Sequence, residues 1–505
     1  MIAQVQAMPT PEIAWTALTP LLALVGGALI LLAVSTLTTA TPPRGAYALV
    51  TVLASVVAMG SSVAIWDRVS DPAQGPYAAV AGALAIDGFT VFLTIVIAVG
   101  VALTALLSDD YLRRENLDGP ELYVLLLLAG AGGLVMAMAN DLIVLFLGLE
   151  SLSIALYVAA GFHRRRAESR EAAMKYFVLG AFSSAFLLYG IALVYGATGS
   201  TNLVKISSFL SANVLEREGL LLAGFALLLV GLGFKVSAVP FHVWTPDVYQ
   251  GAPTPVTAFM ASASKTAAFA ALLRVFVTTF YAQRVDWQPL IAGLAVATLV
   301  VGAVLAIVQS DVKRMMAYSS ISHAGFILVG VQVATARGTS SALFYLLAYT
   351  FLIVGTFGVA TIVGRRGDAA HALTDYRGLA TRRPGLALTF TVFLLAQAGV
   401  PLTTGFLAKF YVIDAAVEAR SYWLAIVAML SAVISAFLYL RVVVAMYMSE
   451  PEEADGDAGG RLRIPAGAGI ALAIALAFTL VVGVAPDRIA GWADEAVPVL
   501  TADNR

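Results

Sequence analysis

Four lysines and one glutamate lie inside strongly apolar stretches of the sequence, where charged side chains are rare. Only six of the 30 Lys and Arg residues are Lys, and four of the six, Lys175, Lys235, Lys265 and Lys409, lie in such stretches, as does Glu150. A charged side chain at the centre of a bilayer costs about 2.5–3.5 kcal/mol on insertion scales, so such residues usually have a function. Arginine stays charged in proteins, whereas a desolvated lysine can lose its proton. This selective use of lysine indicates proton exchange.

Glu150 is placed to act as the counter-ion of a buried lysine. It follows Asp141 by nine residues, which is about 13 Å along a helix, and so falls near the middle of a membrane span. An ionised carboxylate there would keep Lys235 or Lys175 protonated, and its absence would favour proton release. Alternatively, the charges form ion pairs that only hold the helices together. Four lysines against one mid-membrane acid leave positive charge unpaired, which favours proton transfer.

Two of the lysines lie next to breaks in their predicted helices. Four prolines occupy residues 240–255, shortly after Lys235, while Pro401 and Gly405 precede Lys409. Proline removes a backbone N–H donor and breaks helices, and irregular backbone at membrane depth is tolerated only where it is buried in protein or lines a water-filled cavity. We therefore expect a hydrated gap beside each of these lysines.

The four histidines are secondary candidates. His323 lies in a serine-rich segment and could relay a proton, because imidazole titrates near pH 6.5; a hydrogen-bonded core histidine is an equal alternative. His242 adjoins the first break, where it could relay a proton or only hydrogen-bond freed carbonyls. His163 and His371 fall in basic loops and are expected to face solvent.

No cofactor or metal site is predicted on this chain. The sequence has no cysteine, which excludes disulfides, thiolate zinc sites and iron–sulfur ligation, and its histidines show no pairing that would suit a haem. Phosphate-binding loops, dinucleotide fingerprints and nucleophile elbows are also absent from the sequence. A net charge of -1 leaves no basic surplus for binding nucleic acid.

The composition is that of a membrane protein. Hydrophobic residues make up 60% of the 505 residues and charged residues 12%, the mean hydropathy is +0.89, and soluble domains carry roughly 25% charged residues. A bilayer core needs about 20 apolar residues per helix. Fourteen segments meet this length: 14–36, 46–66, 88–108, 122–140, 142–162, 173–196, 219–238, 256–278, 288–310, 315–336, 339–364, 386–412, 421–447 and 465–486. The predicted fold is an all-α polytopic membrane protein, a single membrane domain over residues 1–505, with spans seven and twelve broken.

Basic residues are distributed unevenly between the two sets of loops. Loops after odd-numbered spans carry sixteen Lys and Arg residues, and the opposite loops together with the two tails carry eight. Cytoplasmic loops are enriched in Lys and Arg, and an even number of spans places both termini on one side of the membrane. Both termini are therefore predicted on the non-cytoplasmic side. The first span lacks the basic n-region of a cleaved signal peptide, so we expect it to be retained.

A weak internal similarity indicates two repeats. Residues 150–157 (ESLSIALY) in span five resemble residues 319–326 (SSISHAGF) in span ten, and each segment is followed, 85 or 90 residues later, by a buried lysine beside a break. Five spans per repeat would give the two repeats opposite orientations, the inverted arrangement of transporters. The chain then divides into leading spans (14–140, of which span four opens the first repeat), the repeats 122–278 and 288–447, and a last span, 465–486.

At the breaks, the sequence resembles a known family. Residues 234–256 read FKVSAVPFHVWTPDVYQGAPTPV, residues 262–265 read SASK, residues 375–379 read DYRGL and residues 400–410 read VPLTTGFLAKF. These motifs closely resemble the antiporter-like membrane subunits of bacterial proton-pumping NADH:quinone oxidoreductase (respiratory complex I, NDH-1), and among them the subunit N form. Subunit M usually carries Glu at the position of Lys409, and subunit L continues into a long lateral helix for which this chain has no room.

The resemblance implies roles for the buried charges and for other subunits. It implies that Glu150 and Lys235 form a pair, that Lys265 is a central relay, that Lys409 lies nearest the release side, and that Lys175 is a further carrier near the pair. Electrons would pass from NADH through FMN and iron–sulfur clusters to quinone in other subunits. Neighbouring membrane subunits and the lipid bilayer of the bacterial plasma membrane are the implied partners, and enzyme activity would belong to the whole complex.

Two alternatives remain open from the sequence. A subunit of a multi-subunit Na⁺/H⁺ antiporter would have the same fold, lysines and broken helices without redox partners, so copurification of flavin and iron–sulfur absorbance would separate the two. The other alternative, an inert scaffold for neighbouring subunits, predicts that replacing Lys235 by Met leaves pumping intact.

Overall fold

Long apolar helices form most of the structure, a computed structural model that describes all residues except 1–13, 38–42, 214–217, 451–462 and 502–505. Thirteen of them are long and apolar enough to cross a membrane. They are α1 (Trp15–Leu37), α2 (Ala46–Ser70), α3 (Gly88–Arg114), α4 (Glu121–Met138), α5 (Leu142–Ala160), α6 (Ala167–Thr198), α8 (Glu218–Val236), the continuous helical segment Thr254–Thr279, Tyr281–Ile307 containing α12 (Arg284–Ile307), α13 (Val312–Val333), α14 (Ala336–Val363), α18 (Tyr422–Met448) and α19 (Ala466–Val484).

The remaining predicted span, 386–412, is divided into two short helices. α16 (Pro384–Ala398) ends before Pro401, and α17 (Thr404–Glu418) begins after it. Gly399 adopts a positive φ of 97° at the end of α16, and the Thr403 side chain accepts a hydrogen bond from the backbone N–H of Phe406 to cap α17. The predicted all-α polytopic fold with a broken span twelve is thereby confirmed.

Span seven is also broken where the prolines are. α8 ends one residue after Lys235, and an irregular segment leads to the short helix α9 (Thr245–Gly251). The next span begins with α10 (Thr254–Phe259), whose first turn contains Pro255, a position where the missing N–H is harmless. It continues through a π-helical turn, η1 (Met260–Ser264), into α11 (Lys265–Leu272) and a second π-helical segment, η2 (Leu273–Thr279). π-helical turns are rare and frequently occur at functional sites.

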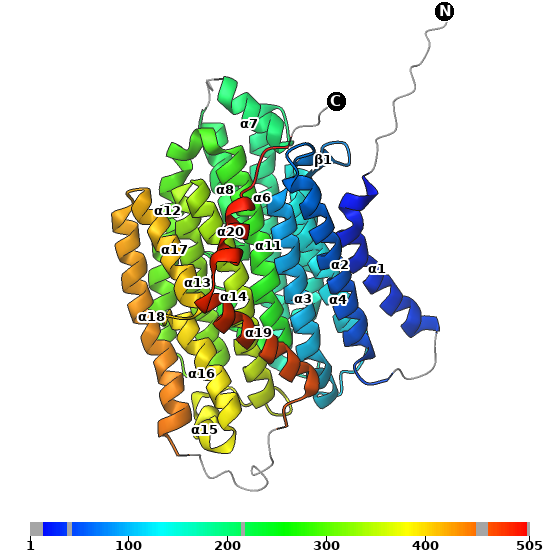
Figure 1. Cartoon of the computed structure of the whole chain (residues 1–505), viewed down its shortest axis with the longest axis vertical. Helices are drawn as coiled ribbons and strands as arrows, with labels where there is room; N and C mark the ends of the chain where they lie inside the picture. The colour runs from blue at the N-terminus through cyan, green and yellow to red at the C-terminus, as the bar shows by residue number, and fades with distance from the viewer. Residues whose placement is uncertain (1–13, 38–42, 214–217, 451–462, 502–505) are drawn as a thin grey trace, which may run out of the picture.

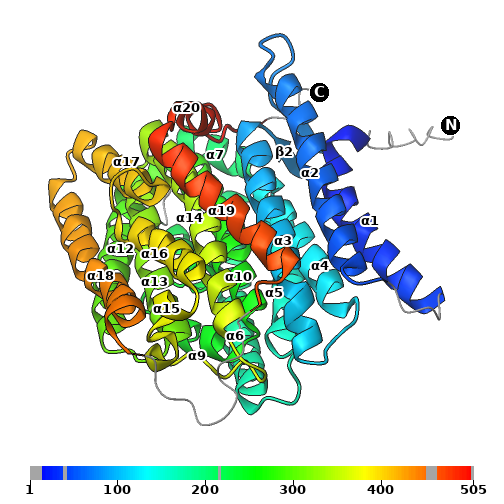
Figure 2. The same ribbon diagram turned by 60° about the horizontal axis from the view of Figure 1, so that its bottom comes forward.

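Several short elements were not predicted. Strands β1 (Tyr77–Ala79) and β2 (Leu84–Ile86) form an antiparallel hairpin. The short helices are α7 (Leu203–Ala212), η3 (Tyr281–Gln283), η4 (Leu373–Tyr376), α15 (Leu379–Arg382) and α20 (Asp487–Glu495). In Figures 1 and 2, α1 and α18 lie at opposite edges of the bundle, and the span that carries Lys265 runs through its middle. Residues 254–276 of that span are all buried.

Matching local features recur in the two halves. Asp141 caps the start of α5 and pairs with Asn202 in an isolated β-bridge; Asp311 caps the start of α13 and pairs with Ala372 in the same way. Each half also contains a broken span, α8/α9 or α16/α17. These features agree with two five-span repeats, whose boundaries stay a prediction.

The loops fall at two ends of the bundle, and both ends of the described chain lie at the same one, as an even number of spans requires. α1 begins, and the last described residues lie, at the end that carries β1 and α7, opposite α15 (Figure 1). Arg217, Arg461 and Arg505, which entered the count of basic residues, lie outside the described residues.

Candidate functional site

Lys235 is buried at the end of α8 and contacts aromatic side chains. Its Nζ donates a hydrogen bond to the Tyr176 hydroxyl at 3.1 Å and lies 4.9 Å from the Tyr176 ring centroid and 5.4 Å from that of Tyr157. Trp244, beyond the break, stacks on Tyr176 and donates its indole N–H to the Phe234 carbonyl. The break thus supplies Trp244, which packs against Tyr176, the residue that accepts the hydrogen bond of this lysine.

Glu150 does not contact Lys235. It lies half-buried on α5, where the Ser184 hydroxyl of α6 donates a hydrogen bond to its carboxylate. Among the residues that the structure describes, no ion pair joins Glu150 to a basic side chain. The implied Glu–Lys pair is therefore at most an interaction through space.

Lys175 lies elsewhere than expected. Its Nζ forms ion pairs with Asp247 at 2.6 Å and Glu171 at 2.7 Å, and its side chain is 40% exposed. The expectation of a buried carrier near Glu150 and Lys235 is not met, because α6 begins six residues before the predicted span and leaves Lys175 near the helix end.

Lys265 is fully enclosed at the middle of the bundle. It follows the π-helical turn directly, and its Nζ donates to the backbone carbonyl of Ser320 at 2.8 Å and to the Ser320 hydroxyl at 2.5 Å. Both acceptors are neutral oxygens on α13. No carboxylate pairs with Lys265 in the described part of the chain.

The ammonium group of Lys409 is bound by backbone carbonyls at the break in span twelve. Its Nζ donates to the carbonyls of Gln397 at 2.7 Å and Ala398 at 3.0 Å. These are the last carbonyls of α16, which lack helical partners and carry the partial negative charge of the helix C-terminus. The ring of Phe326 lies 5.0 Å from Nζ. The break thus creates the acceptors that a buried ammonium requires.

A chain of hydroxyl and imidazole groups lies between Lys265 and Lys409, and most of it was not predicted. His323 bonds to the hydroxyls of Tyr345 at 2.6 Å and Tyr439 at 3.1 Å. Tyr439 in turn bonds to the Ser319 hydroxyl at 2.6 Å, which reaches the Gln397 side chain at 3.4 Å. Ser319 neighbours the partner of Lys265, and Gln397 supplies a carbonyl to Lys409. The serines around His323 were the one sequence signal for this chain.

His242 lies half-buried in the irregular segment after α8. Its carbonyl accepts a hydrogen bond from the Thr245 N–H at 2.8 Å, and its ring Nδ1 has no partner among the described residues. The structure does not bring it into the chain that contains His323. Its role as a relay stays a prediction.

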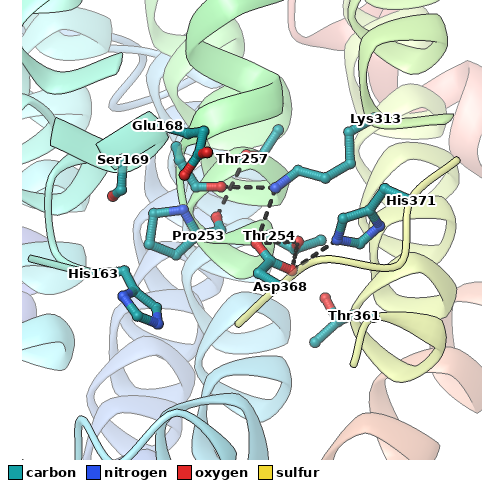
Figure 3. A network of polar contacts seen from close by, with 12 residues as sticks. His163, Glu168, Ser169, Pro253, Thr254, Thr257, Lys313, Thr361, Asp368 and His371 are labelled. Carbon is teal, nitrogen blue, oxygen red and sulfur yellow. Dashed lines mark hydrogen bonds and ion pairs between the residues drawn. The ribbon is translucent and has the colours of Figure 1, made fainter. Parts of the chain in front are cut away.

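A second polar cluster was missed entirely. Asp368, in the loop after α14, is buried and accepts hydrogen bonds from Lys313 at 3.0 Å, His371 at 2.8 Å and Thr254 at 2.8 Å (Figure 3). Arg166 donates a further hydrogen bond to it at 3.2 Å. Lys313 falls in the loop between the predicted spans 288–310 and 315–336, and His371 is predicted to face solvent, yet they are 0% and 4% exposed. His163 is also buried, against Glu115. These expectations were wrong because loops of different spans cover one another.

The described residues contain no group of three or more His, Asp or Glu side chains that could hold a metal ion. The arrangement consists of lysines, hydroxyls and imidazole. Such groups can accept and donate protons.

Comparison with known proteins decides the family. The model of the family described as NADH:quinone oxidoreductase/Mrp antiporter, TM matches residues 139–435. NADH-quinone oxidoreductase subunit N of Trichlorobacter lovleyi is 46% identical over 415 residues, which cover 82% of this chain and 84% of that relative. The chain belongs to the NADH-quinone oxidoreductase subunit N family. Subunit N 3 of Streptomyces griseus subsp. griseus is 43% identical over 529 residues, covering 96% of this chain and 94% of that one.

Solved structures agree with membership of the subunit N family. A chain of respiratory complex I from Thermus thermophilus with bound Aureothin superposes with a TM-score of 0.77 at 33% identity and covers 94% of this chain and 98% of its own. A chain of the Mrp complex from Dietzia sp. DQ12-45-1b has a TM-score of 0.81 at 20% identity and covers 96% of this chain and 97% of its own. The second likeness concerns the fold alone. The chain is thus a multi-pass membrane subunit of an enzyme complex.

Proposed function

We propose that this chain moves protons across the membrane through Lys235, Lys265 and Lys409, as a subunit of a proton-pumping NADH:quinone oxidoreductase. The observation that carries the proposal is the set of partners of these lysines. All three are buried, and all donate to neutral oxygens. A neutral oxygen holds the ammonium without fixing its charge, whereas an adjacent carboxylate favours the charged form.

The proposed path runs along the middle of the bundle from Lys235 through Lys265 to Lys409. Between the last two, the proton passes along the hydroxyls of Ser320, Ser319 and Tyr439, while Gln397 holds the Ser319 hydroxyl through its side chain and Lys409 through its backbone carbonyl. From Lys235 toward Lys265, the ring of Tyr249 lies 6.0 Å from that of Trp244, which stacks on Tyr176. The buried hydroxyls of Tyr249 and Tyr349 have no hydrogen-bond partner among the described residues. Buried polar groups are normally satisfied by protein or ordered water, so bound waters complete this stretch.

Other charged groups act from outside the path. Glu150 acts through its electric field on Lys235, and Lys175 acts at the polar surface where Asp247 lies. Electron transfer from NADH to quinone takes place on FMN and iron–sulfur clusters of other subunits. Neighbouring membrane subunits contact this chain in the bacterial plasma membrane, with both termini on the non-cytoplasmic side.

Replacement of Lys265 by Met tests the proposal. The variant removes the central proton carrier, so proton pumping in vesicles driven by NADH and quinone should be lost while the complex stays assembled. Lys205→Met is the matched control, because Lys205 is exposed on α7. Normal pumping by Lys265→Met would refute the path and favour a scaffold role.

Copurification distinguishes the proposed redox complex from a multi-subunit Na⁺/H⁺ antiporter. Flavin and iron–sulfur absorbance that accompanies the tagged chain supports the redox complex. A purified assembly without these chromophores, with Na⁺/H⁺ exchange in vesicles, would favour the antiporter.

A further inference from the structure

The Asp368 cluster borders a charged crevice between the two halves of the molecule. The crevice has a volume of about 590 Å³ and opens between α6 and α9 on one side and the start of α13 and the loop after α14 on the other. Its charged lining comprises Arg166, Glu168, Glu171, Lys175, Asp247, Asp311, Arg314, Asp368 and His371. It lies at the end of the bundle predicted to face the cytoplasm. Water and dissolved protons can enter it, while the buried lysines of the path cannot be reached directly from solvent.

We propose that His371 is the proton-uptake site of this chain, and that Asp368 positions it to pass protons through Lys313 toward Lys265. This inference rests on the proposed function and extends the path to the aqueous side. His371 lines the crevice and is 4% exposed, and its Nδ1 is buried without a hydrogen-bond partner among the described residues. Buried polar atoms are normally satisfied by protein or ordered water, so a bound water between Nδ1 and the crevice delivers the proton in this proposal.

The other ring nitrogen is fixed by Asp368. His371 Nε2 lies 2.8 Å from Oδ1 of Asp368, and Lys313 Nζ lies 3.0 Å from Oδ2 of the same carboxylate (Figure 3). Burial by itself would raise the pKa of Asp368, but Lys313, His371 and Arg166 hold that pKa well below its usual value. Asp368 therefore stays ionised and accepts N–H bonds from both sides, which leaves Nδ1 of His371 as the free nitrogen.

One carboxylate shared by two bases couples their protonation. When Nδ1 takes a proton through this water, His371 becomes a cation, and His371 and Arg166 then balance the single negative charge of Asp368. Unlike the two carboxylates beside Lys175, the shared carboxylate no longer fixes the charge of Lys313, and repulsion from His371 favours release of a proton from Lys313 inward. Lys313 is then recharged from His371 across the carboxylate. This transfer leaves the remaining proton of His371 on Nδ1. Movement of that proton to Nε2 through water restores the starting tautomer, and the cluster then has the charge and protonation with which it began.

Lys313 faces the span that carries Lys265. Its Nζ also donates to the Ala252 carbonyl at 2.8 Å, at the junction between α9 and α10. On α13, Lys313 precedes Ser320 by seven residues, which is two turns or about 10.5 Å, so both lie on one helix face. Ser320 is the partner of Lys265. Tyr249, with its unpaired hydroxyl, belongs to α9 at the same junction.

The charged groups around His371 come from every neighbouring element. They are Asp311, Lys313 and Arg314 at the start of α13, Arg166 and Glu168 at the start of α6, Asp247 from α9 across the crevice, and Asp368 from the same loop. Apart from Lys313, which shares Asp368 with His371, these groups are arginines and carboxylic acids. Imidazole alone among these side-chain types exchanges its proton between pH 5 and 8.

His371→Gln tests the assignment because glutamine can still donate to Asp368 but cannot carry a proton. Its matched control is His163→Gln, since His163 is buried beside Glu115 in the same region but does not line the crevice. Both are measured in the intact complex, reconstituted in vesicles, as NADH-driven pumping between pH 6 and pH 8.5. His371→Gln should pump near normally at pH 6 and about tenfold more slowly at pH 8.5, the low side of what a positioned acid–base group contributes. The control should follow the wild-type profile.

A pH-independent loss in both variants would show a structural role and overturn the assignment, as would a wild-type profile in His371→Gln. If that variant fails to assemble, His371→Gly is tested with external imidazole, which should restore pumping; assembly without rescue overturns the proposal. Lys265→Met separates the two proposals. If it abolishes pumping while His371→Gln behaves like its control, only the uptake site is wrong; if it pumps normally, the path itself is wrong.

Discussion

Whether a buried lysine can exchange protons depends on what holds its ammonium group. Lys175 has two carboxylates within 2.7 Å, so its charge is fixed and its side chain is partly exposed. Lys265 and Lys409 have hydroxyl and carbonyl oxygens instead, which serve the charged and the neutral amine alike. Residue type and depth in the sequence cannot separate these two classes. The hydrogen-bond partners can.

This distinction predicts that Lys409→Arg blocks proton transfer although it keeps the positive charge. A guanidinium keeps the positive charge and can donate to the same carbonyls, but it does not release its proton. NADH-driven pumping should fall at least about tenfold, as much as in Lys409→Ala, when proton uptake into vesicles is measured. Lys175→Arg is the control and should keep most of its activity, because both ion pairs can form again. Pumping by Lys409→Arg at the wild-type rate would remove this residue from the path.

Glu150→Gln should have a smaller effect than loss of a lysine. Glu150 makes no contact with Lys235, and two charges beyond contact distance interact by roughly 1–2 kcal/mol at an effective dielectric constant of about 20. We therefore expect pumping to slow by about tenfold or less with the complex intact, with Glu171→Gln as an exposed control. Normal proton-to-electron stoichiometry and rate in vesicles would exclude a role for Glu150.

The residues predicted from sequence were those with a strong local signal. Lys265 and Lys409 are charges in apolar segments, and both lie where expected. His371 and Lys313 carry no such signal, because their burial comes from Asp368, whose partners lie between 3 and 202 residues away in the sequence. The Glu150–Lys235 contact failed for a related reason: sequence depth fixes the height of a side chain in the membrane but not the direction in which its helix face points.

At the scale of elements, the breaks were predicted from proline, while their geometry was not. The junction between α16 and α17 is so tight that a Cβ on Gly405 would collide with the Ala396 carbonyl. Short elements such as α7, α15 and β1 escaped prediction because they lack a span-length apolar signal. The second break has two structural effects. It leaves the Gln397 and Ala398 carbonyls at the end of α16 free of helical partners, and it places α17 so that Lys409 can donate to them.

Gly405→Ala should therefore affect both stability and pumping. Relief of the clash would displace α17 and weaken the bonds of Lys409 to Gln397 and Ala398, and overpacking typically costs about 1–3 kcal/mol. We expect a lower unfolding temperature of the complex and reduced pumping. Gly293→Ala, in α12 with open space around its Cα, should leave both unchanged. A Gly405→Ala complex with wild-type stability and pumping would show that the close crossing has no influence on Lys409.

At the scale of the whole molecule, two halves with matching helix caps and broken spans contribute the polar residues of the proposed path. The first half supplies Lys235, Lys265 and the α9 side of the crevice; the second supplies α13, Lys409 and the loop that carries Asp368. In the proposed path, neither half contains the complete route from the crevice to Lys409. A path that crosses the boundary between the halves follows from this division, and its direction depends on which end of the bundle faces the cytoplasm.

The orientation can be tested directly because the natural chain contains no cysteine. Ala73 lies in the exposed turn between α2 and β1, and Arg164 lies in the exposed loop between α5 and α6, so Ala73→Cys and Arg164→Cys each introduce a single accessible thiol. If loops rich in arginine face the cytoplasm, a membrane-impermeant maleimide added to intact spheroplasts should label only the Ala73→Cys variant, and in inside-out vesicles it should label only the Arg164→Cys variant. The reverse pattern would invert the molecule, and the crevice with His371 would then face the release side and could not take up protons for outward pumping.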